Sequence, residues 1–263
     1  MCALLFFDID GTLITLDDSH TFPESTKQAL LKAKDKGHKI FINTGRVRTA
    51  VDKQLKNFPF DGMVCGCGTY IEYEGQSLYH AILKQEDCVT YARRLHECGV
   101  ETVFEGKNQL YVDGNHGKGE FLEFIFDYFS KNSEMPIRNY LDADIQYDKF
   151  TTYLRPGCNE KLFYETFETD FHLIPHGGQV IEAVPRHTSK ATGIHFLEEY
   201  LKCSHENSYA FGDSINDMEM LRYVPHSIGM GNAVSQVKDV VEFVTEDVTA
   251  DGIAVAMKHY NLI

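Results

Sequence analysis

Short apolar runs alternate with helix-like segments over the first 65 residues, and this alternation limits the folds that the chain can adopt. The runs at 4–7, 38–43 and 63–65 are short enough to be strands that are buried on both faces. A segment that stops near Gly37 has an apolar stripe at helical spacing, and a second helix is expected over 47–55. Strands that alternate with helices through short links are typical of a parallel sheet. The sequence therefore predicts an α/β fold with a parallel-sheet core.

The middle of the chain has a different pattern. Between about 70 and 185, hairpin-like strand pairs and two helix candidates replace the regular alternation. The strand candidates are 70–73, 78–82, 100–104, 109–112, 149–154 and 180–184, and the helix candidates are 86–98 and 119–130. Alternation resumes after Pro185, with helices expected at 188–201, 217–223 and 250–259 and a strand at 208–211. We therefore expect residues 1–82 and 186–263 to form one core domain, with an α+β domain inserted at 83–185.

Composition excludes several classes of protein. The chain has 263 residues, of which 25 are Lys or Arg and 39 are Asp or Glu, so its formal net charge is −14. Such an acidic chain lacks the basic face that nucleic acids and anionic membranes require, so we expect neither as a partner. The longest apolar run, Met1–Phe7, is far shorter than the roughly 18 residues of a membrane span and lacks the features of a signal peptide. Seven cysteines, an odd number, argue against a disulfide framework and favour a cytoplasmic location.

Two acidic residues follow the first apolar run directly. Asp8 and Asp10 are two positions apart, so on an extended chain their side chains point to the same side. Gly11 then allows the backbone to turn tightly. Ligands of parallel sheets bind at the carboxyl ends of the strands, where both acids would face a cleft. An acidic loop that is merely solvated is the alternative interpretation of this stretch.

A second acidic group follows the expected strand at 208–211. Asp213 and Asp217 would converge with Asp8 and Asp10 on one edge of the sheet. Clustered oxygen ligands suit a hard cation, above all Mg²⁺. Without a cation, such acids would repel one another and raise their pKa values. The alternative is that Asp213 begins a loop and Asp217 caps a helix.

Two weaker features complete a candidate phosphate site. Thr44, Gly45 and Arg46 follow the second strand and offer a hydroxyl and backbone N–H groups at an expected helix start. Lys190 begins the helix after the insert, and its ammonium could reach a phosphate oxygen. Thr44 could instead be a plain N-cap and Lys190 a surface lysine.

In order and spacing, these motifs resemble the four motifs of the haloacid dehalogenase (HAD) superfamily. The matching stretches are Asp8-Ile9-Asp10-Gly11-Thr12, Thr44-Gly45-Arg46, Lys190, and Gly212-Asp213 with Asn216-Asp217. The insertion between the second and third motifs and the segment from Ile228 to Ala233 are similar to the Cof-type branch. That branch consists of phosphatases of sugar phosphates and other metabolites with a large α/β cap. The resemblance covers nearly the whole chain and implies a Rossmann-like, HAD-like core with 83–185 as an inserted α+β cap domain.

The resemblance also implies a role for each matching residue. Asp8 is expected to be the nucleophile that becomes an aspartyl-phosphate, and Asp10 the general acid and base. Mg²⁺ is expected on Asp8, on the backbone carbonyl of Asp10 and on Asp213, with Asp217 supporting the site from a second layer. The remaining positions are expected to bind the substrate: Ile9, Thr44, Gly45, Arg46, Lys190 and Asn216.

The function that the resemblance implies is a cytoplasmic, Mg²⁺-dependent phosphatase that hydrolyses a small phosphorylated metabolite. A phosphotransferase or mutase with the same aspartyl-phosphate is an alternative, although mutases of this superfamily usually carry a smaller cap after the first motif. A second alternative is a phosphate-binding regulator without turnover. Asp10 argues against this regulator, because a hydrolytic base would destroy a lasting acyl-phosphate. The sequence identifies neither the substrate, nor the cap residues that select it, nor the oligomeric state.

One departure from the family's pattern follows the third strand. Where members commonly have an Asn-Gly pair, this chain has Cys65-Gly66-Cys67-Gly68. A zinc site would need further soft ligands nearby in the sequence, and none are present. We therefore expect small residues that pack a turn near the cleft, with no assigned role for Cys65 or Cys67.

Overall fold

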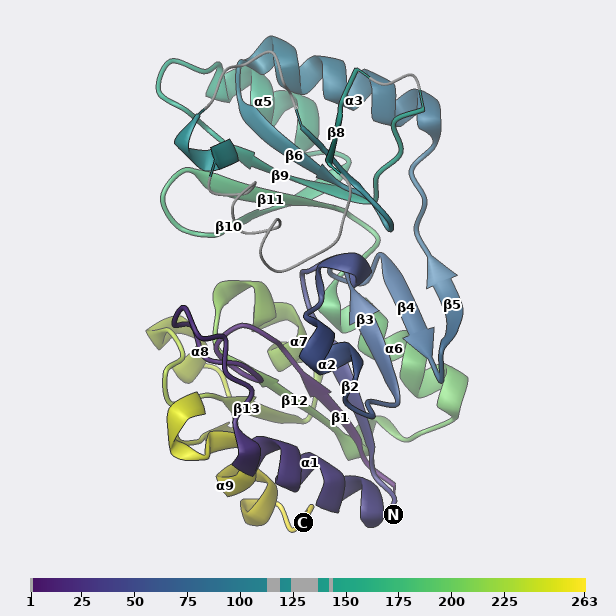
Figure 1. Ribbon diagram of the computed structural model, residues 1–263, viewed down its shortest axis with the longest axis vertical. Coiled ribbons are helices and arrows are strands. Elements are labelled where there is room, and N and C mark those ends of the chain that lie inside the picture. Colours follow the sequence, from purple (N-terminus) through teal and green to yellow (C-terminus); the bar gives the residue numbers. More distant parts are fainter. Residues whose placement is uncertain (1, 113–118, 124–136, 142–143) are drawn as a thin grey trace. The chain divides into compact units, whose positions relative to one another are not determined.

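The chain divides into two compact units, which are described separately. The computed structural model describes residues 2–112, 119–123, 137–141 and 144–263 (Figure 1). The first unit comprises residues 1–45, 53–78 and 189–263, and the second comprises 46–52 and 79–188. The predicted domain limits, 82/83 and 185/186, stay a prediction. The units of the structure differ from them most at 46–52, a segment that the sequence assigns to the core.

A mixed eight-stranded sheet forms the centre of the first unit. Its order is β14-β13-β12-β1-β2-β3-β4-β5, in which neighbours from β14 to β3 are parallel and β3 and β4 are antiparallel. The strands are β1 (Leu4–Phe7), β2 (Lys39–Asn43), β3 (Gly62–Cys65), β4 (Tyr70–Tyr73), β5 (Gln76–His80), β12 (Ser208–Gly212), β13 (His226–Gly229) and β14 (Phe243–Val244). The predicted α/β class with a parallel-sheet core is confirmed.

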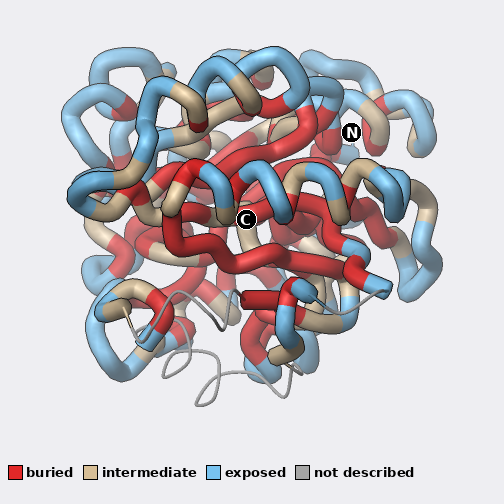
Figure 2. The backbone as a smooth tube through the Cα atoms, turned by 90° about the horizontal axis from the view of Figure 1, so that it is seen from above, coloured by how far each residue is buried: buried red, intermediate tan, exposed pale blue. Residues whose placement is uncertain are grey.

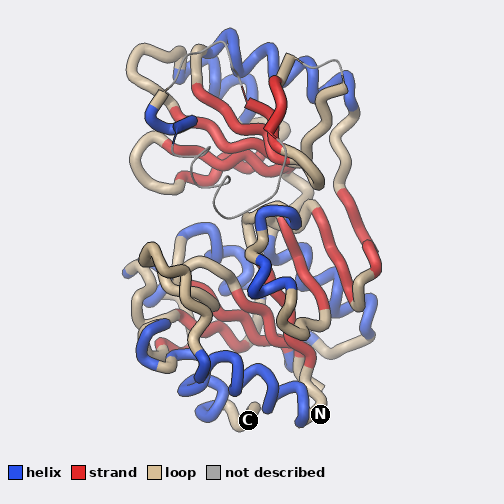
Figure 3. The backbone as a smooth tube through the Cα atoms, viewed as in Figure 1, coloured by secondary structure: helices blue, strands red, loops and turns tan. Residues whose placement is uncertain are grey.

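Helices cover both faces of this sheet (Figure 3). They are α1 (Glu24–Asp35), α2 (Lys53–Lys56), α6 (Lys190–Leu201), α7 (Met218–Tyr223), α8 (Ser235–Lys238) and α9 (Gly252–His259). The crossover from β1 through α1 to β2 and the crossover from β12 through α7 to β13 run in opposite directions along the sheet. Because such crossovers are right-handed, the reversal places the two helices on opposite faces. Accordingly, α1 packs on α9, and α6 packs on α7.

The central strands are buried on both sides (Figure 2). Every residue of β1 is fully buried, as expected for a strand with helices above and below it. Phe6 stacks on Phe41 of β2 with ring centroids 5.1 Å apart, and Phe7 stacks on Phe211 of β12 at 4.5 Å. These contacts join the three strands whose carboxyl ends carry the sequence motifs.

The second unit has its own six-stranded sheet, with the order β10-β11-β9-β6-β7-β8. The strands are β6 (Glu101–Glu105), β7 (Leu110–Val112), β8 (Ile137–Asn139), β9 (Lys149–Tyr153), β10 (Phe171–Pro175) and β11 (Val180–Pro185). Helices α3 (Gln85–Cys98) and α5 (Glu160–Phe167) lie side by side on this sheet (Figure 1). Phe104, Phe150 and Phe163 belong to the apolar cluster that joins these helices to the strands.

Neighbouring positions on the same strands carry a buried ion network. Lys149 Nζ donates to Glu105 at 2.8 Å and to Glu182 at 2.6 Å, and His176 Nε2 lies 2.7 Å from the other carboxylate oxygen of Glu182. Side chains alternate between the two faces of a strand, so this network lies on the face opposite Phe104 and Phe150. Burial alone would raise the pKa of Glu182, but Lys149 and His176 lower it well below its usual range.

The predicted helix over 47–55 is wrong. The structure has a single 3₁₀ turn, η1 (Arg48–Ala50), and the short helix α2 begins only at Lys53. A continuous helix would put Val47 and Leu55 on one face. Val47 and Ala50 instead pack in an apolar cluster of the second unit, whereas Leu55 is buried in the first unit. The chain therefore changes direction between the two packing sites.

Other differences concern single elements. The predicted helix at 119–130 is observed at residues 120–123, and the remainder lies outside the described residues. The sequence analysis did not predict β8, α5, β10, β13, α8 or β14. Among the described helices, none has the length and apolar character needed to cross a membrane.

Candidate functional site

Lys190 links two carboxylates at the carboxyl end of the first unit's sheet. Its Nζ donates to Asp8 Oδ1 at 2.6 Å and to Asp217 Oδ1 at 2.5 Å. The side chains are almost fully buried, with exposed fractions of 1% for Lys190, 6% for Asp8 and 0% for Asp217. Lys190 is the first residue of α6, whose start is capped reciprocally: the Ser189 hydroxyl accepts from the Thr192 N–H, and the Thr192 hydroxyl accepts from the Ser189 N–H. The structure thus brings three of the predicted site residues into direct contact.

Strand register explains why motifs that are distant in the sequence meet here. Phe7 of β1 is paired with Ile42 of β2 and with Phe211 of β12. The residues that follow these three therefore lie at one level, at the carboxyl end of the sheet. Asp8 is one of them, and Asp213 lies one residue beyond that level.

Asp217 fixes both Lys190 and the loop after β12. Its Oδ1 accepts from Lys190, and its Oδ2 accepts from the backbone N–H groups of Asp213 at 2.9 Å and Ser214 at 3.0 Å. Gly212 leaves room for this carboxylate, because a Cβ atom there would lie 2.7 Å from Asp217 Cβ. The predicted interpretation of Asp217 as a plain helix cap therefore omits its contact with Lys190.

The loop after β1 is held against Asp213 by residues that the sequence analysis did not select. Thr12 Oγ1 donates to Asp213 Oδ1 at 3.2 Å. Asn232 Nδ2 donates to the Gly11 carbonyl at 2.8 Å, and its Oδ1 accepts from the Val248 N–H at 3.0 Å. Both residues lie within stretches quoted for the family resemblance, which is the signal that could have identified them.

The carboxylates are packed more closely than their charges favour. Burial raises the pKa of Asp8 to about 7, with a further contribution from the charge of Asp217, although Lys190 opposes the shift. Burial likewise raises the pKa of Asp213 to about 8, helped by the charge of Asp8. For Lys190, burial alone would lower the pKa, but the carboxylates of Asp217 and Asp8 outweigh it and raise the value. When all three carboxylates are ionised they face one ammonium, so negative charge is left uncompensated.

This donor set fits a hard divalent cation. Carboxylate oxygens of Asp8, Asp213 and Asp217 lie within 4.8 Å of one another. Closely spaced, buried carboxylates with raised pKa values are stabilised by a cation, because it offsets their mutual repulsion. Mg²⁺ prefers one or two carboxylates together with other oxygen ligands, which this edge of the sheet offers.

The second predicted motif is only partly at this edge. Thr44 directly follows β2 and is buried, and its N–H donates to the Val64 carbonyl at 2.9 Å. No helix begins directly at Thr44, Gly45 or Arg46, so the predicted helix N-terminus at this motif is wrong. Arg46 belongs to the second unit, where its guanidinium donates to Asp52 at 2.9 Å. Val47 packs with that unit, and this explains why no helix continues from Thr44.

The other predicted positions flank the acidic residues. The side chain of Ile9 is fully buried, so Ile9 can serve a ligand only through its backbone. Asp10 is partly exposed. Asn216 is also partly exposed, and its Oδ1 accepts from Ser214 Oγ at 2.6 Å.

A tight turn follows β3 beside the start of α6. Gly66, Cys67 and Gly68 all have positive φ values, of 57°, 51° and 88°. A Cβ atom at Gly68 would lie 2.3 Å from the Ser189 carbonyl oxygen, so the turn requires a glycine there. Cys65 and Cys67 are buried, and neither belongs to the cluster of possible metal ligands found in the described chain.

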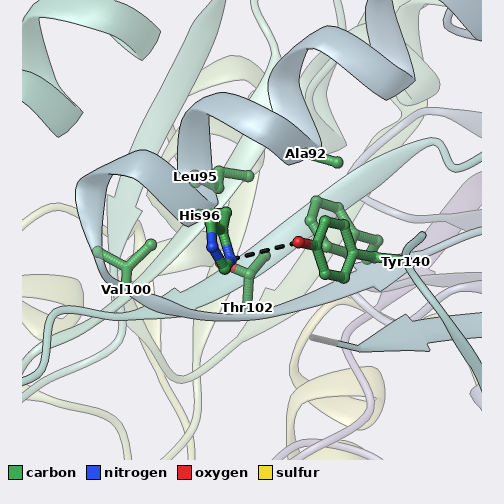
Figure 4. A pocket seen from close by; sticks show the side chains of 7 residues that line it. Ala92, Leu95, His96, Val100, Thr102 and Tyr140 are labelled. Atoms are coloured by element: carbon green, nitrogen blue, oxygen red, sulfur yellow. Dashed lines mark hydrogen bonds between the residues drawn. The ribbon is translucent and has the colours of Figure 1, made fainter. Parts of the chain in front are cut away.

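A cavity in the second unit is too small to be a ligand site. It lies between α3 and β6 and has no room for a water molecule (Figure 4). Its lining includes His96 and Tyr140, whose Nδ1 and hydroxyl are 3.2 Å apart. The acidic cluster of the first unit is therefore a stronger candidate site than this cavity.

The chain is similar to known proteins over nearly its whole length. Residues 5–257 match the sequence profile of the haloacid dehalogenase-like hydrolases. The chain is 30% identical over 263 residues to a Bacillus subtilis (strain 168) protein named "Putative phosphatase YkrA", covering 99% of this chain and 98% of that protein. It is 24% identical over 273 residues to the 5-amino-6-(5-phospho-D-ribitylamino)uracil phosphatase YitU of the same strain, covering 98% and 97%.

A solved structure supports the same match. The HAD subclass IIB sugar phosphatase BT4131 aligns with a TM-score of 0.83 and 28% sequence identity, covering 99% of this chain and 100% of that chain. The similarity therefore extends over both units of the chain.

Proposed function

The chain belongs to the haloacid dehalogenase-like hydrolase family, and from this premise we propose that it is a phosphatase acting on phosphomonoesters of small metabolites. The observation that carries the proposal is the contact of Lys190 with Asp8 at 2.6 Å, beside the buried carboxylate of Asp213. A carboxylate held in this way is oriented as a nucleophile. The names of the relatives support a sugar phosphate, or a similar phosphomonoester with a polyol chain, as the substrate.

In the proposed reaction, Asp8 and Asp10 divide the chemistry. An Asp8 oxygen forms a bond to phosphorus while the bond from phosphorus to the substrate oxygen breaks, and Asp10 gives that oxygen its proton. Asp10 then takes a proton from a water molecule whose oxygen attacks the aspartyl-phosphate. This second step releases inorganic phosphate and restores the Asp8 carboxylate. Lys190 orients Asp8 and offsets negative charge on the phosphoryl oxygens.

Asp8, Asp213 and the backbone carbonyl of Asp10 would hold Mg²⁺, while Asp217 fixes the loop of Asp213. The cation would neutralise charge between the Asp8 carboxylate and the phosphate dianion, which otherwise repel each other.

The proposed phosphoryl-binding donors are Lys190, the Thr44 hydroxyl, the Asn216 amide and the backbone N–H groups of Ile9 and Gly45. Arg46 would have to leave Asp52 before it could contribute. We further propose that the protein works in the cytoplasm, since it has an odd number of cysteines, seven.

The experiment that tests the proposal measures hydrolysis of p-nitrophenyl phosphate and of a panel of sugar and polyol phosphates. We expect turnover that requires Mg²⁺ and stops in excess chelator. Ca²⁺ should inhibit, because its higher coordination number allows Asp8 to bind through both oxygens. Full activity in chelator would contradict the assignment of the acidic cluster.

Two substitutions separate the roles of the acids. Asp8→Asn removes the nucleophile, so turnover should be lost while the fold is kept. Asp10→Asn should still be phosphorylated by p-nitrophenyl phosphate, since nitrophenolate leaves without a proton, but it should then stall. Intact-mass spectrometry would detect the added phosphoryl group on Asp10→Asn and its absence on Asp8→Asn. The reverse labelling pattern would show that the roles are exchanged.

A further inference from the structure

Asn43 connects the end of β2 to the residue that carries the site's ammonium group. Its side chain is fully buried, and its Nδ2 donates to the Lys190 backbone carbonyl at 3.0 Å, across 147 positions of sequence. The same nitrogen lies 3.5 Å from Met220 Sδ. Asn43 therefore contacts the backbone of Lys190, whereas Asp8 and Asp217 contact its side chain.

The first turn of α6 is also held by close packing at two positions. A Cβ atom at Gly193 would lie 2.3 Å from Val64 Cγ1 of β3, so the helix touches that strand directly. The turn at Gly68, which follows the same strand, touches the Ser189 carbonyl. Asn43 adds a polar contact to the backbone of Lys190. The Lys190 backbone is thereby fixed relative to the strand ends that carry the acidic motifs.

The hydrogen-bond pattern of Asn43 argues against a purely stabilising role. Its Oδ1 is buried and has no donor among the residues that the structure describes. An unsatisfied buried acceptor costs stability, so an apolar side chain of similar size would suit this position at least as well. The Lys190 carbonyl does not need Asn43 either, because α6 itself supplies the N–H of Ile194. What the amide adds is a directed contact to Lys190.

We propose that Asn43 is a positioning residue, which fixes the start of α6 so that Lys190 Nζ is held at Asp8. The inference rests on the proposed phosphatase function, in which Lys190 orients the nucleophile. A displacement of about 1 Å in such a group lowers turnover by up to about a hundredfold. Asn43 is separate from the predicted motif that begins at Thr44, and its side chain is fully buried.

The test compares Asn43→Leu with the wild-type protein and with Ser208→Ala as a matched control. Ser208 is also fully buried, and its hydroxyl donates to Glu198 at 2.5 Å, at the opposite end of β12 from Asp213. For Asn43→Leu we expect kcat on p-nitrophenyl phosphate with Mg²⁺ to fall about tenfold or more, with Tm unchanged or higher. Ser208→Ala should lower Tm and leave kcat within about twofold of the wild type.

A second readout does not depend on activity or on the cation. Hydrogen exchange of the backbone amides at 190–194, followed by mass spectrometry in chelator, should be faster in Asn43→Leu than in the wild type and unchanged in Ser208→Ala. If Asn43→Leu does not fold, Asn43→Ala replaces it. Wild-type kcat and unchanged exchange in the Asn43 variant would overturn the inference. Absence of turnover in the wild type would instead contradict the proposed function, and the exchange comparison would still decide whether Asn43 anchors α6.

Discussion

Single glycines determine how closely the two acidic loops can approach each other. A Cβ atom at Gly11 would lie 2.5 Å from Asp213 Oδ2, and the backbone there has a φ of +79°. Gly37 provides a matched control, because its φ is +87° but a Cβ atom would meet nothing within 4 Å. The two positions share the backbone strain of an added side chain and differ only in the clash with Asp213.

Gly37→Ala should therefore lower the free energy of unfolding by about 1–2 kcal/mol and leave activity unchanged. Gly11→Ala should lower it further and weaken Mg²⁺ binding by about tenfold or more, because Asp213 must move. Chemical denaturation gives the stabilities, and Mg²⁺ titration of activity gives the affinities. Equal effects of the two substitutions would mean that the contact between Gly11 and Asp213 is unimportant.

The raised pKa values of Asp8 and Asp213 predict how pH acts on the cation-free protein. Their values, about 7 and about 8, lie above the usual 3.8 of an aspartate. Between about pH 4 and 8 the folded protein therefore keeps protons that the unfolded chain releases, so its free energy of unfolding falls as pH rises. Mg²⁺ requires the ionised carboxylates, and its stabilising effect should grow over the same range.

This expectation is measured as the difference in Tm with Mg²⁺ and with chelator at pH 5 and pH 8. The difference should be larger at pH 8, and Asp213→Asn should reduce its pH dependence. If the Tm difference in the wild type is the same at both pH values, the pKa values of Asp8 and Asp213 are not raised.

The acidic residues and Lys190 could be selected from the sequence because each follows a recognisable strand or begins a recognisable helix. The contacts between them could not be selected in the same way. Thr12, Asn43 and Asn232 act through hydrogen bonds to residues between 147 and 221 positions away in the chain. No local pattern of charge or periodicity encodes such a contact, because it depends on the register of the strands.

At the scale of helices and strands, errors arose where packing overrode local periodicity. The apolar spacing of 47–55 suits a helix, but Val47 and Leu55 are buried in different units. Helix α5 was missed although Asn159 caps it by accepting from the Leu162 N–H at 3.1 Å. Its two buried residues, Phe163 and Phe167, are too few to show a clear period in the sequence. The bounds of β1, β2, β3 and β12 in the first unit were predicted to within one residue, because each strand contains a run of apolar residues.

The ion network of β6, β9 and β11 gives a prediction at this scale. Lys149→Met would leave the carboxylates of Glu105 and Glu182 buried without their shared cation. We expect a loss of about 3–5 kcal/mol in the free energy of unfolding at pH 7. Lys161→Met is the control, because Lys161 is 84% exposed and lies 3.7 Å from Glu165, and it should change stability by less than about 0.5 kcal/mol.

Acidification should reduce the loss in the free energy of unfolding that Lys149→Met causes. The pKa of Glu182 is lowered in the folded protein, so the network contributes stability above the usual glutamate pKa and loses it as pH falls. Denaturation of both variants at pH 7 and pH 4 measures the effect. A Lys149→Met protein as stable as Lys161→Met at pH 7 would contradict the prediction.

At the scale of the whole molecule, the family could be predicted from the sequence, because the motifs occur along the chain in the family's order. The predicted domain limits stay a prediction, and the units of the structure differ from them most at the short segment 46–52, which belongs to the second unit although it lies between two elements of the first. The sequence does not show on which unit the apolar residues of this segment pack. In the structure, Val47 and Ala50 pack in one cluster with Val103 and Leu110, which lie more than fifty positions later in the chain.

Apart from Arg46, the first unit contains every residue to which we assign chemistry, so it should work in part without the second. Replacing residues 83–184 by a short Gly/Ser linker would expose Val47 and Ala50, and the shortened chain should therefore also carry Val47→Ser and Ala50→Ser. We expect it to fold, because the eight-stranded sheet keeps its helices and its central strands. Asp8, Asp213 and the Asp10 carbonyl should still bind Mg²⁺, and the shortened chain should hydrolyse p-nitrophenyl phosphate slowly. Calorimetry and a rate assay would measure these two properties. The same chain with Asp8→Asn should bind substrate without turnover. A shortened chain that is folded but neither binds Mg²⁺ nor hydrolyses the ester would show that the chemistry requires the second unit.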